Sequence, residues 1–188
     1  KNKLSDNNKL IVKYKIDGSK NKLETLVDLI PWYPSKLISD PIIKKSSNYQ
    51  EFEFLIDKKD EKIITFKKGN WEINRPIILP KGYKLLVEKN TNIKTNNDGI
   101  IIVRGPIIIN GTKDNLVNIY SENSGKGILV LNSSEKSYLN FVKFSGLYAP
   151  KKISVSIMGA INFYNAPVII ENSIFDNIYS EDALNIIR

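Results

Sequence analysis

The pattern of hydrophobic and polar positions changes near residue 63. From there on, the chain consists of short runs rich in Ile, Val and Leu, each closed by Gly, Asn or Pro. Runs of this length are too short for helices and are typical of β-strands that end in tight turns. We therefore predict an all-β architecture for this part of the chain.

Internal repeats distinguish a solenoid from a sandwich of hairpins. Residues 159–163 (GAINF) return 23 positions later as residues 182–186 (DALNI), and residues 139–147 overlay residues 170–178 at a step of 31. Asn92 and the apolar run 100–103 have counterparts 26 to 27 positions later. Such steps fit successive coils of a β-solenoid, and residues 148–156 fit a loop inserted at one corner.

The first 50 residues have a mixed pattern. Residues 9–16 alternate apolar and basic side chains, as a half-exposed strand does. Residues 21–30 place apolar side chains at helical spacing, with Asn21 and Glu24 as a capping pair and Pro31 as the stop. We therefore predict a mixed α/β cap or linker over residues 1–50, whose one short helix is a candidate lid for the first coil.

Residues 51–56 (EFEFLI) alternate and predict a strand with Phe52, Phe54 and Ile56 on one face. We assign residues 51–188 to parallel coils. The last of these, residues 182–188, ends inside a strand pattern, which predicts an open C-terminal end covered by further coils or by another protein chain.

Asparagine is concentrated from Asn70 onward and needs a structural reason. An asparagine side chain tolerates left-handed backbone geometry and bonds to neighbouring backbone, so it suits the tight corners of a coil. We predict that most of these asparagines, including Asn162 stacked over Asn185, are corner or ladder residues.

The chain has a formal charge of +8, but only Arg75, Arg104 and Arg188 are arginines. Nucleic-acid readers depend on the forked contacts that arginine makes, and the basic excess here is spread along the chain. We expect no nucleic-acid partner and, because no apolar run approaches the required length, no membrane span. The absence of Cys and His excludes disulfides, thiolate metal sites and a histidine base.

The order of motifs in residues 77–121 resembles the first coils of secreted bacterial right-handed parallel β-helix proteins of the pectate-lyase-like kind. An apolar run, Pro-x-Gly, an apolar-x-Val-Glu segment, Thr-x-Ile and Gly-Thr-x-Asp-Asn follow one another there. The resemblance implies a right-handed parallel β-helix and a secreted or cell-envelope location. The family contains lyases, hydrolases, epimerases and adhesins, so it implies no single activity.

The acidic residues near the C-terminus are the strongest candidates for a site. Asp176, Glu181 and Asp182 lie in a stretch without Lys or Arg. The resemblance implies that such carboxylates bind calcium, for which Asp176 and Asp182 are the candidates, or act as an acid and base pair. The alternative is that they are solvent-exposed residues of a turn. The positions equivalent to them in the preceding coil hold no carboxylate, so no acidic pair forms by stacking.

Two further sets of residues carry alternatives. Trp32 and Tyr33, between two prolines, are candidates for stacking on a sugar ring, or else pack against a neighbouring part of the protein. Arg104 and Arg188 are candidates for the base of a lyase, although Arg104 has the position of an ordinary outward residue.

We predict a secreted or cell-surface module with a binding or structural role and a polysaccharide as its ligand. One alternative is a polysaccharide lyase, epimerase or hydrolase whose catalytic coils lie beyond residue 188. The other is a subunit of an extracellular assembly joined through open solenoid ends.

Overall fold

The computed structural model describes residues 10–15, 18–27, 44–150 and 157–187. The chain divides into two compact units, residues 1–35 and residues 36–188. Within the part of the chain described, no helix is long and apolar enough to cross a membrane.

In the first unit, strands β1 (Leu10–Lys15) and β2 (Lys22–Val27) form an antiparallel hairpin. The helix predicted over residues 21–30 is therefore wrong for residues 22–27. Short apolar runs fit helical and extended spacing alike, and β1 supplies cross-strand partners such as Tyr14 for Leu23. Glu24, assigned to a helix cap, instead lies 2.7 Å from the ammonium group of Lys13.

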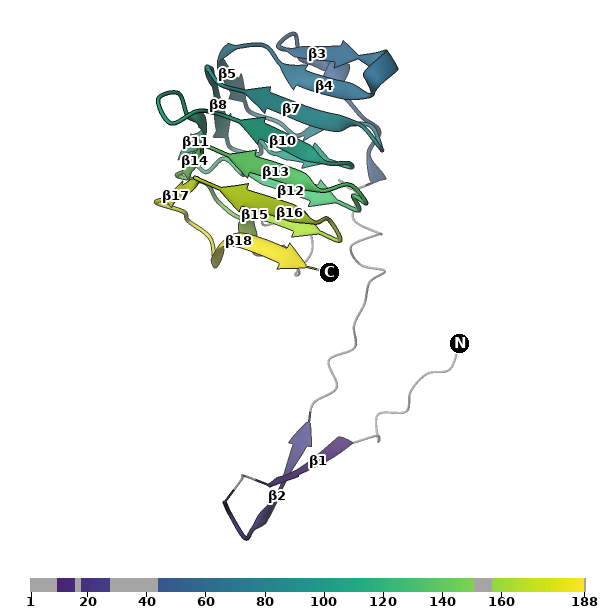
Figure 1. Ribbon diagram of the computed structural model, residues 1–188, viewed down its shortest axis with the longest axis vertical. Coiled ribbons are helices and arrows are strands. Elements are labelled where there is room, and N and C mark those ends of the chain that lie inside the picture. Colours follow the sequence, from purple (N-terminus) through teal and green to yellow (C-terminus); the bar gives the residue numbers. More distant parts are fainter. Residues whose placement is uncertain (1–9, 16–17, 28–43, 151–156, 188) are drawn as a thin grey trace. The chain divides into compact units, whose positions relative to one another are not determined.

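The second unit is an all-β solenoid of parallel strands. Its described residues between 63 and 187 make five coils, and each coil contributes one strand to each of three sheets. Figure 1 shows the strands of one sheet lying one below another from β4 to β16.

The three sheets are numbered here in the order in which a coil visits them. Sheet 1 contains β4 (Ile63–Phe66), β7 (Lys84–Glu88), β10 (Ile107–Asn110), β13 (Ser137–Asn140) and β16 (Val168–Glu171). Sheet 2 contains β5 (Gly69–Ile73), β8 (Thr91–Asn96), β11 (Val117–Asn123), β14 (Val142–Ser145) and β17 (Ile174–Asp176). Sheet 3 contains β6 (Ile77–Ile78), β9 (Ile101–Val103), β12 (Ile128–Leu131), β15 (Gly159–Tyr164) and β18 (Asp182–Ile187).

The registers expected from the repeats are confirmed. Gly159 pairs with Asp182, Asn162 with Asn185 and Phe144 with Phe175. Because parallel strands of adjacent coils pair residue by residue, equivalent side chains form columns along the solenoid. The columns that point into the bore are apolar, as in the series Trp71, Ile93, Ile119, Phe144 and Phe175.

Aromatic residues of the second unit cover the first coil. Strand β3 (Leu55–Lys58) pairs antiparallel with β4, between the short 3-10 helices η1 (Tyr49–Glu51) and η2 (Lys59–Glu61). Phe54 stacks on Phe66 and on Trp71, with ring centroids 5.5 and 5.2 Å apart. The strand expected over residues 51–56 thus begins only at Leu55, and parallel pairing begins at Ile63 rather than at residue 51.

Asparagines occupy many of the corners, as expected. Those with a left-handed backbone are Asn90, Asn97, Asn132, Asn165, Asn172 and Asn177. Asn162 differs, because it is buried within β15 and its side-chain amide bonds in both directions to the backbone of Gly159.

The fifth coil is the last one that the structure describes, and its inward side chains are more exposed than those of the coil before it. Ile186 is 51% exposed, whereas Phe163, its partner in β15, is 1% exposed. Phe175 and Leu184 likewise are only partly buried.

Candidate functional site

The outer face of sheet 2 carries two columns of outward side chains that run across all five coils. The first column consists of Asn70, Asn92, Asn118, Lys143 and Ile174. The second column consists of Glu72, Lys94, Tyr120, Ser145 and Asp176.

In coils 1 to 3 the first column is a ladder of amides. The side-chain amide of Asn92 donates to the oxygen of Asn70 at 2.7 Å, and that of Asn118 donates to Asn92 at 2.7 Å. Each amide thus uses its neighbours as hydrogen-bond partners, so the ladder supports the stacking of coils and leaves little polar capacity for a ligand.

Two members of the second column, Lys94 and Asp176, form ion pairs with residues outside that column. Lys94 forms an ion pair and hydrogen bond with Glu122, and Lys143 lies 3.0 Å from the carboxylate of Asp176. The hydrogen bond that Lys94 donates to Glu122 raises the pKa of Lys94 above its usual value. The amide ladder therefore gives way in coils 4 and 5 to a lysine that reaches a carboxylate in the next coil.

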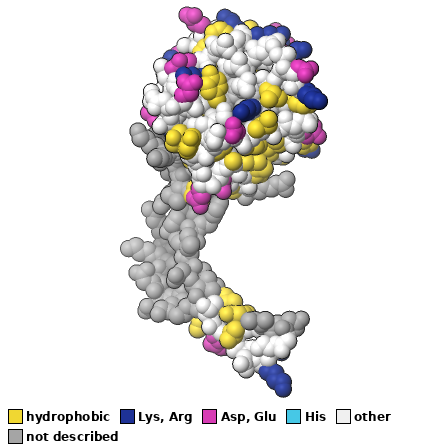
Figure 2. Space-filling model, turned by 90° about the vertical axis from the view of Figure 1, so that its left-hand side faces the viewer, with side chains coloured by type: hydrophobic (Ala, Val, Ile, Leu, Met, Phe, Trp, Pro, Cys, Tyr) yellow, Lys and Arg dark blue, Asp and Glu magenta, His cyan; other side chains and the backbone are white. Residues whose placement is uncertain are grey.

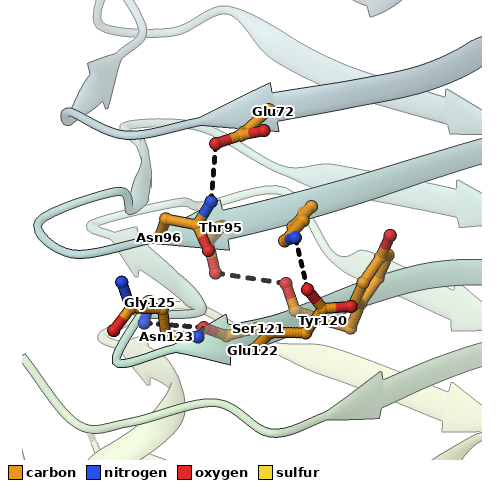
Figure 3. A network of polar contacts seen from close by, with 9 residues as sticks. Glu72, Thr95, Asn96, Tyr120, Ser121, Glu122, Asn123 and Gly125 are labelled. Atoms are coloured by element: carbon orange, nitrogen blue, oxygen red, sulfur yellow. Dashed lines mark hydrogen bonds and ion pairs between the residues drawn. The ribbon is translucent and has the colours of Figure 1, made fainter.

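A bulge in β11 brings Glu122 to this face. The register with β8 shifts between Tyr120 and Asn123, so β11 carries one residue more than its neighbour at this point. The hydroxyl of Ser121, which is buried, accepts the N–H groups of Asn123 at 3.1 Å and of Gly125 at 2.7 Å. Figure 3 shows these bonds beneath the pair formed by Glu122.

The next two coils turn at the same corner in left-handed geometry. Gly146 has φ +66° and Asn177 has φ +48°. A Cβ on Gly146 would collide with the carbonyl oxygen of Ser121, so only glycine lets the backbones approach here.

Two tyrosines stack immediately after this corner. Tyr148 and Tyr179 form a parallel bridge, and their ring centroids lie 4.9 Å apart with planes inclined by 19°. Tyr179 is 58% exposed. The pair therefore presents aromatic surface and two hydroxyl groups beside the outer face of sheet 2.

These elements line an open cavity of about 480 Å³. It is lined by Tyr120, Ser121, Glu122, Ser145, Gly146, Tyr148, Asp176, Asn177 and Tyr179. We call this cavity the tyrosine groove. Figure 2 views the solenoid from the side of sheet 2, where hydrophobic side chains, a class that includes tyrosine, lie among interspersed acidic and basic ones.

Of the predicted acidic residues, Asp176 alone lines the tyrosine groove. Glu181 and Asp182 are exposed in and just after the turn between β17 and β18, where the hydroxyl of Ser180 donates to the carbonyl of Asp182 at 2.6 Å. Asp176 belongs to sheet 2 and Asp182 to sheet 3, so the two calcium candidates lie on different sheets. Among the residues described, no three acidic side chains gather closely enough to hold a metal ion.

Of the other predicted site residues, Arg104 is the one that the structure describes, and it does not line the groove. Trp32, Tyr33 and Arg188 lie outside the described residues. Arg104 lines a separate cavity of about 190 Å³ and donates a hydrogen bond to the carbonyl of Lys45 at 2.7 Å. Burial lowers the pKa of Arg104.

Sequence reasoning missed the tyrosines and Glu122. A signal existed for Tyr148 and Tyr179, because they extend by one residue the 31-residue register that runs from Leu139 over Ile170. No comparable signal existed for Glu122, whose position depends on the bulge in β11.

No family model matches the chain, and searches of curated proteins and of solved structures also found no match.

Proposed function

We propose that this chain is a right-handed parallel β-helix module, secreted or displayed at the cell surface, that binds a polysaccharide in the tyrosine groove. The observation that carries the binding proposal is the groove itself: three tyrosines, two carboxylates and a corner amide line one cavity on the outside of the solenoid. Ligand sites combine apolar or aromatic surface with a few polar groups in this way.

Sugars suit such a lining because their rings have apolar faces and their hydroxyls need hydrogen-bond partners. The rings of Tyr148 and Tyr179 supply flat surface with polar tips. The carboxylates of Glu122 and Asp176 supply acceptors, and the Asn177 amide both donates and accepts.

The right-handed coiling of the solenoid and the extracellular location of the protein are supported by different observations. Parallel strands joined by a crossover within one sheet are almost always connected with a right hand, and every coil here makes such connections. Export is supported by the resemblance of residues 77–121 to secreted β-helix proteins.

Binding to a panel of immobilised polysaccharides tests the proposal. Tyr179→Ala removes an exposed ring of the groove, and Tyr138→Ala is the matched control, because Tyr138 is 43% exposed on the outer face of sheet 1. We expect Tyr179→Ala to abolish retention on the polysaccharide that the wild type binds and Tyr138→Ala to leave it unchanged. Equal retention of both variants would overturn the assignment of the groove, and no retention of the wild type on any member would overturn the function.

A further inference from the structure

The ionisable side chains that line the tyrosine groove are acidic or phenolic. Glu122 and Asp176 contribute carboxylates, and no lysine or arginine is among the described residues of the lining. This contrasts with the whole chain, whose formal charge is +8.

The lysines that pair with these carboxylates do not line the cavity. Lys94 reaches Glu122 from β8, and Lys143 reaches Asp176 from β14. In both pairs the acidic member alone belongs to the lining. The negative ends of two ion pairs thus face the groove.

The tyrosines add to the same preference. An aromatic face carries a negative quadrupole and attracts an ammonium group within about 6 Å. Tyr120, Tyr148 and Tyr179 therefore complement a positive charge, whereas a uronate carboxylate would meet two carboxylates in the same cavity.

We propose that the groove selects a polysaccharide of amino sugars with free ammonium groups over neutral and acidic sugars. This inference rests on the proposed function, since it specifies the ligand class of the same groove. Asp176 and Glu122 recognise the ammonium groups, and the tyrosines cover the sugar rings.

Calorimetric titration of the 188-residue chain with three hexamers tests the inference. The probes are a glucosamine hexamer, its fully N-acetylated form and a galacturonate hexamer, at mildly acidic pH where the amine is protonated. We expect the glucosamine hexamer to bind most tightly and to weaken as salt is added. General attraction to a basic protein would produce the opposite order, because it favours the galacturonate.

Four variants locate the effect. Asp176→Asn and Glu122→Gln keep the shape of the side chain and remove its charge, so each is expected to weaken glucosamine binding roughly tenfold or more. Lys143→Gln removes the cation that competes with the ligand for Asp176, so this variant is expected to bind glucosamine several-fold more tightly. Glu171→Gln, an exposed acid at the end of β16, is the control and is expected to change nothing.

Thermal unfolding of each variant shows whether it is folded, and the gain expected for Lys143→Gln cannot come from a folding defect. Equal binding of all three hexamers, or tighter binding of the acetylated or galacturonate form, would overturn the charge preference and leave the carbohydrate function standing. If none of the hexamers binds and no polysaccharide retains the wild type, both proposals fall. Weaker glucosamine binding by Lys143→Gln would also overturn the inference.

Discussion

The outer face of sheet 2 has two halves that occupy equivalent strand positions and differ in chemistry. In coils 1 to 3, Asn70, Asn92 and Asn118 bond to one another in a ladder. In coils 4 and 5 the same column continues as Lys143, which reaches sideways to Asp176 beside the tyrosine groove. The same sheet thus carries an amide ladder across coils 1 to 3 and a cavity across coils 3 to 5.

The difference shows how a solenoid separates stability from recognition. An amide that donates to one neighbour and accepts from the next uses its hydrogen-bonding groups in contacts between coils. A carboxylate or a phenol that faces a cavity keeps capacity for a ligand, and here the corner made by Gly146 and Asn177 creates the room. Variants in each half should therefore have separable effects.

The largest effect should come from the core that both halves share. Phe144 is fully buried and its ring stacks on Phe175 at 5.2 Å. Phe144→Ala is expected to lower the free energy of unfolding by about 3–5 kcal/mol, as measured by urea denaturation. The control is Ile174→Ala, whose side chain is 46% exposed and whose loss should cost under about 1 kcal/mol. Similar losses for both would contradict the assignment of inward and outward columns.

The next effect concerns the corner of the groove. Gly146→Ala places a Cβ against the Ser121 carbonyl in left-handed geometry and is expected to cost about 3 kcal/mol. Gly82→Ala is the matched control, because Gly82 also has positive φ, +79°, but no atom within 4 Å of the added Cβ. It should cost about 1–2 kcal/mol. If thermal unfolding gives equal losses for the two, close approach of coils at Gly146 is refuted.

A pH effect is expected at the cap over coil 1. The Tyr49 hydroxyl donates to Asp57 at 2.6 Å, and this hydrogen bond, with burial, raises the pKa of Tyr49. The raised pKa means that the folded state holds the phenol proton more tightly than the unfolded chain. The resulting stability is present below pH of about 10 and is lost as the pH rises through the folded pKa.

Tyr49→Phe should therefore cost about 1–2 kcal/mol at neutral pH, and its difference from the wild type should shrink above pH of about 10. Urea denaturation of both proteins across this pH range checks the prediction. A difference that stays constant with pH would show that the hydrogen bond to Asp57 does not govern the titration of Tyr49.

The smallest effect on stability is expected in the amide ladder. Asn92→Ala removes one donated and one accepted hydrogen bond at a half-buried position, at a cost of about 1 kcal/mol. Ligand binding should stay unchanged. Asp176→Asn should show the reverse, with ligand binding weakened and the free energy of unfolding changed by less than about 0.5 kcal/mol. Loss of binding in Asn92→Ala would mean that the two halves are not separable.

The sequence predicted the parallel stack and its registers because stacking places like residues on like, as with Phe144 over Phe175. It also predicted asparagine corners, because few residues tolerate left-handed geometry. It failed at residues 22–27, where the extended conformation depends on pairing with β1, the preceding strand of the hairpin. Local spacing carries no information about such a partner.

The candidate site was predicted only in part, for a related reason. Asp176 was found from the lack of nearby lysines in the sequence, yet Lys143 approaches it from the coil before. Glu122 reaches the groove through a bulge that the Ser121 hydroxyl stabilises. The Lys143–Asp176 pair forms between coils, and the position of Glu122 depends on a local irregularity of one strand. Neither produces a repeating pattern in the sequence from which it could be predicted.

Nuclear magnetic resonance mapping of the sugar-binding surface tests the central claim most directly. Backbone amide shifts of the isotope-labelled chain would be followed during titration with the polysaccharide fragment that binds best. The account predicts changes confined to residues 120–122, 145–148 and 176–179, with Asn70, Asn92 and Asn118 unmoved. Changes centred on the amide ladder, or on the cavity beside Arg104, would contradict it.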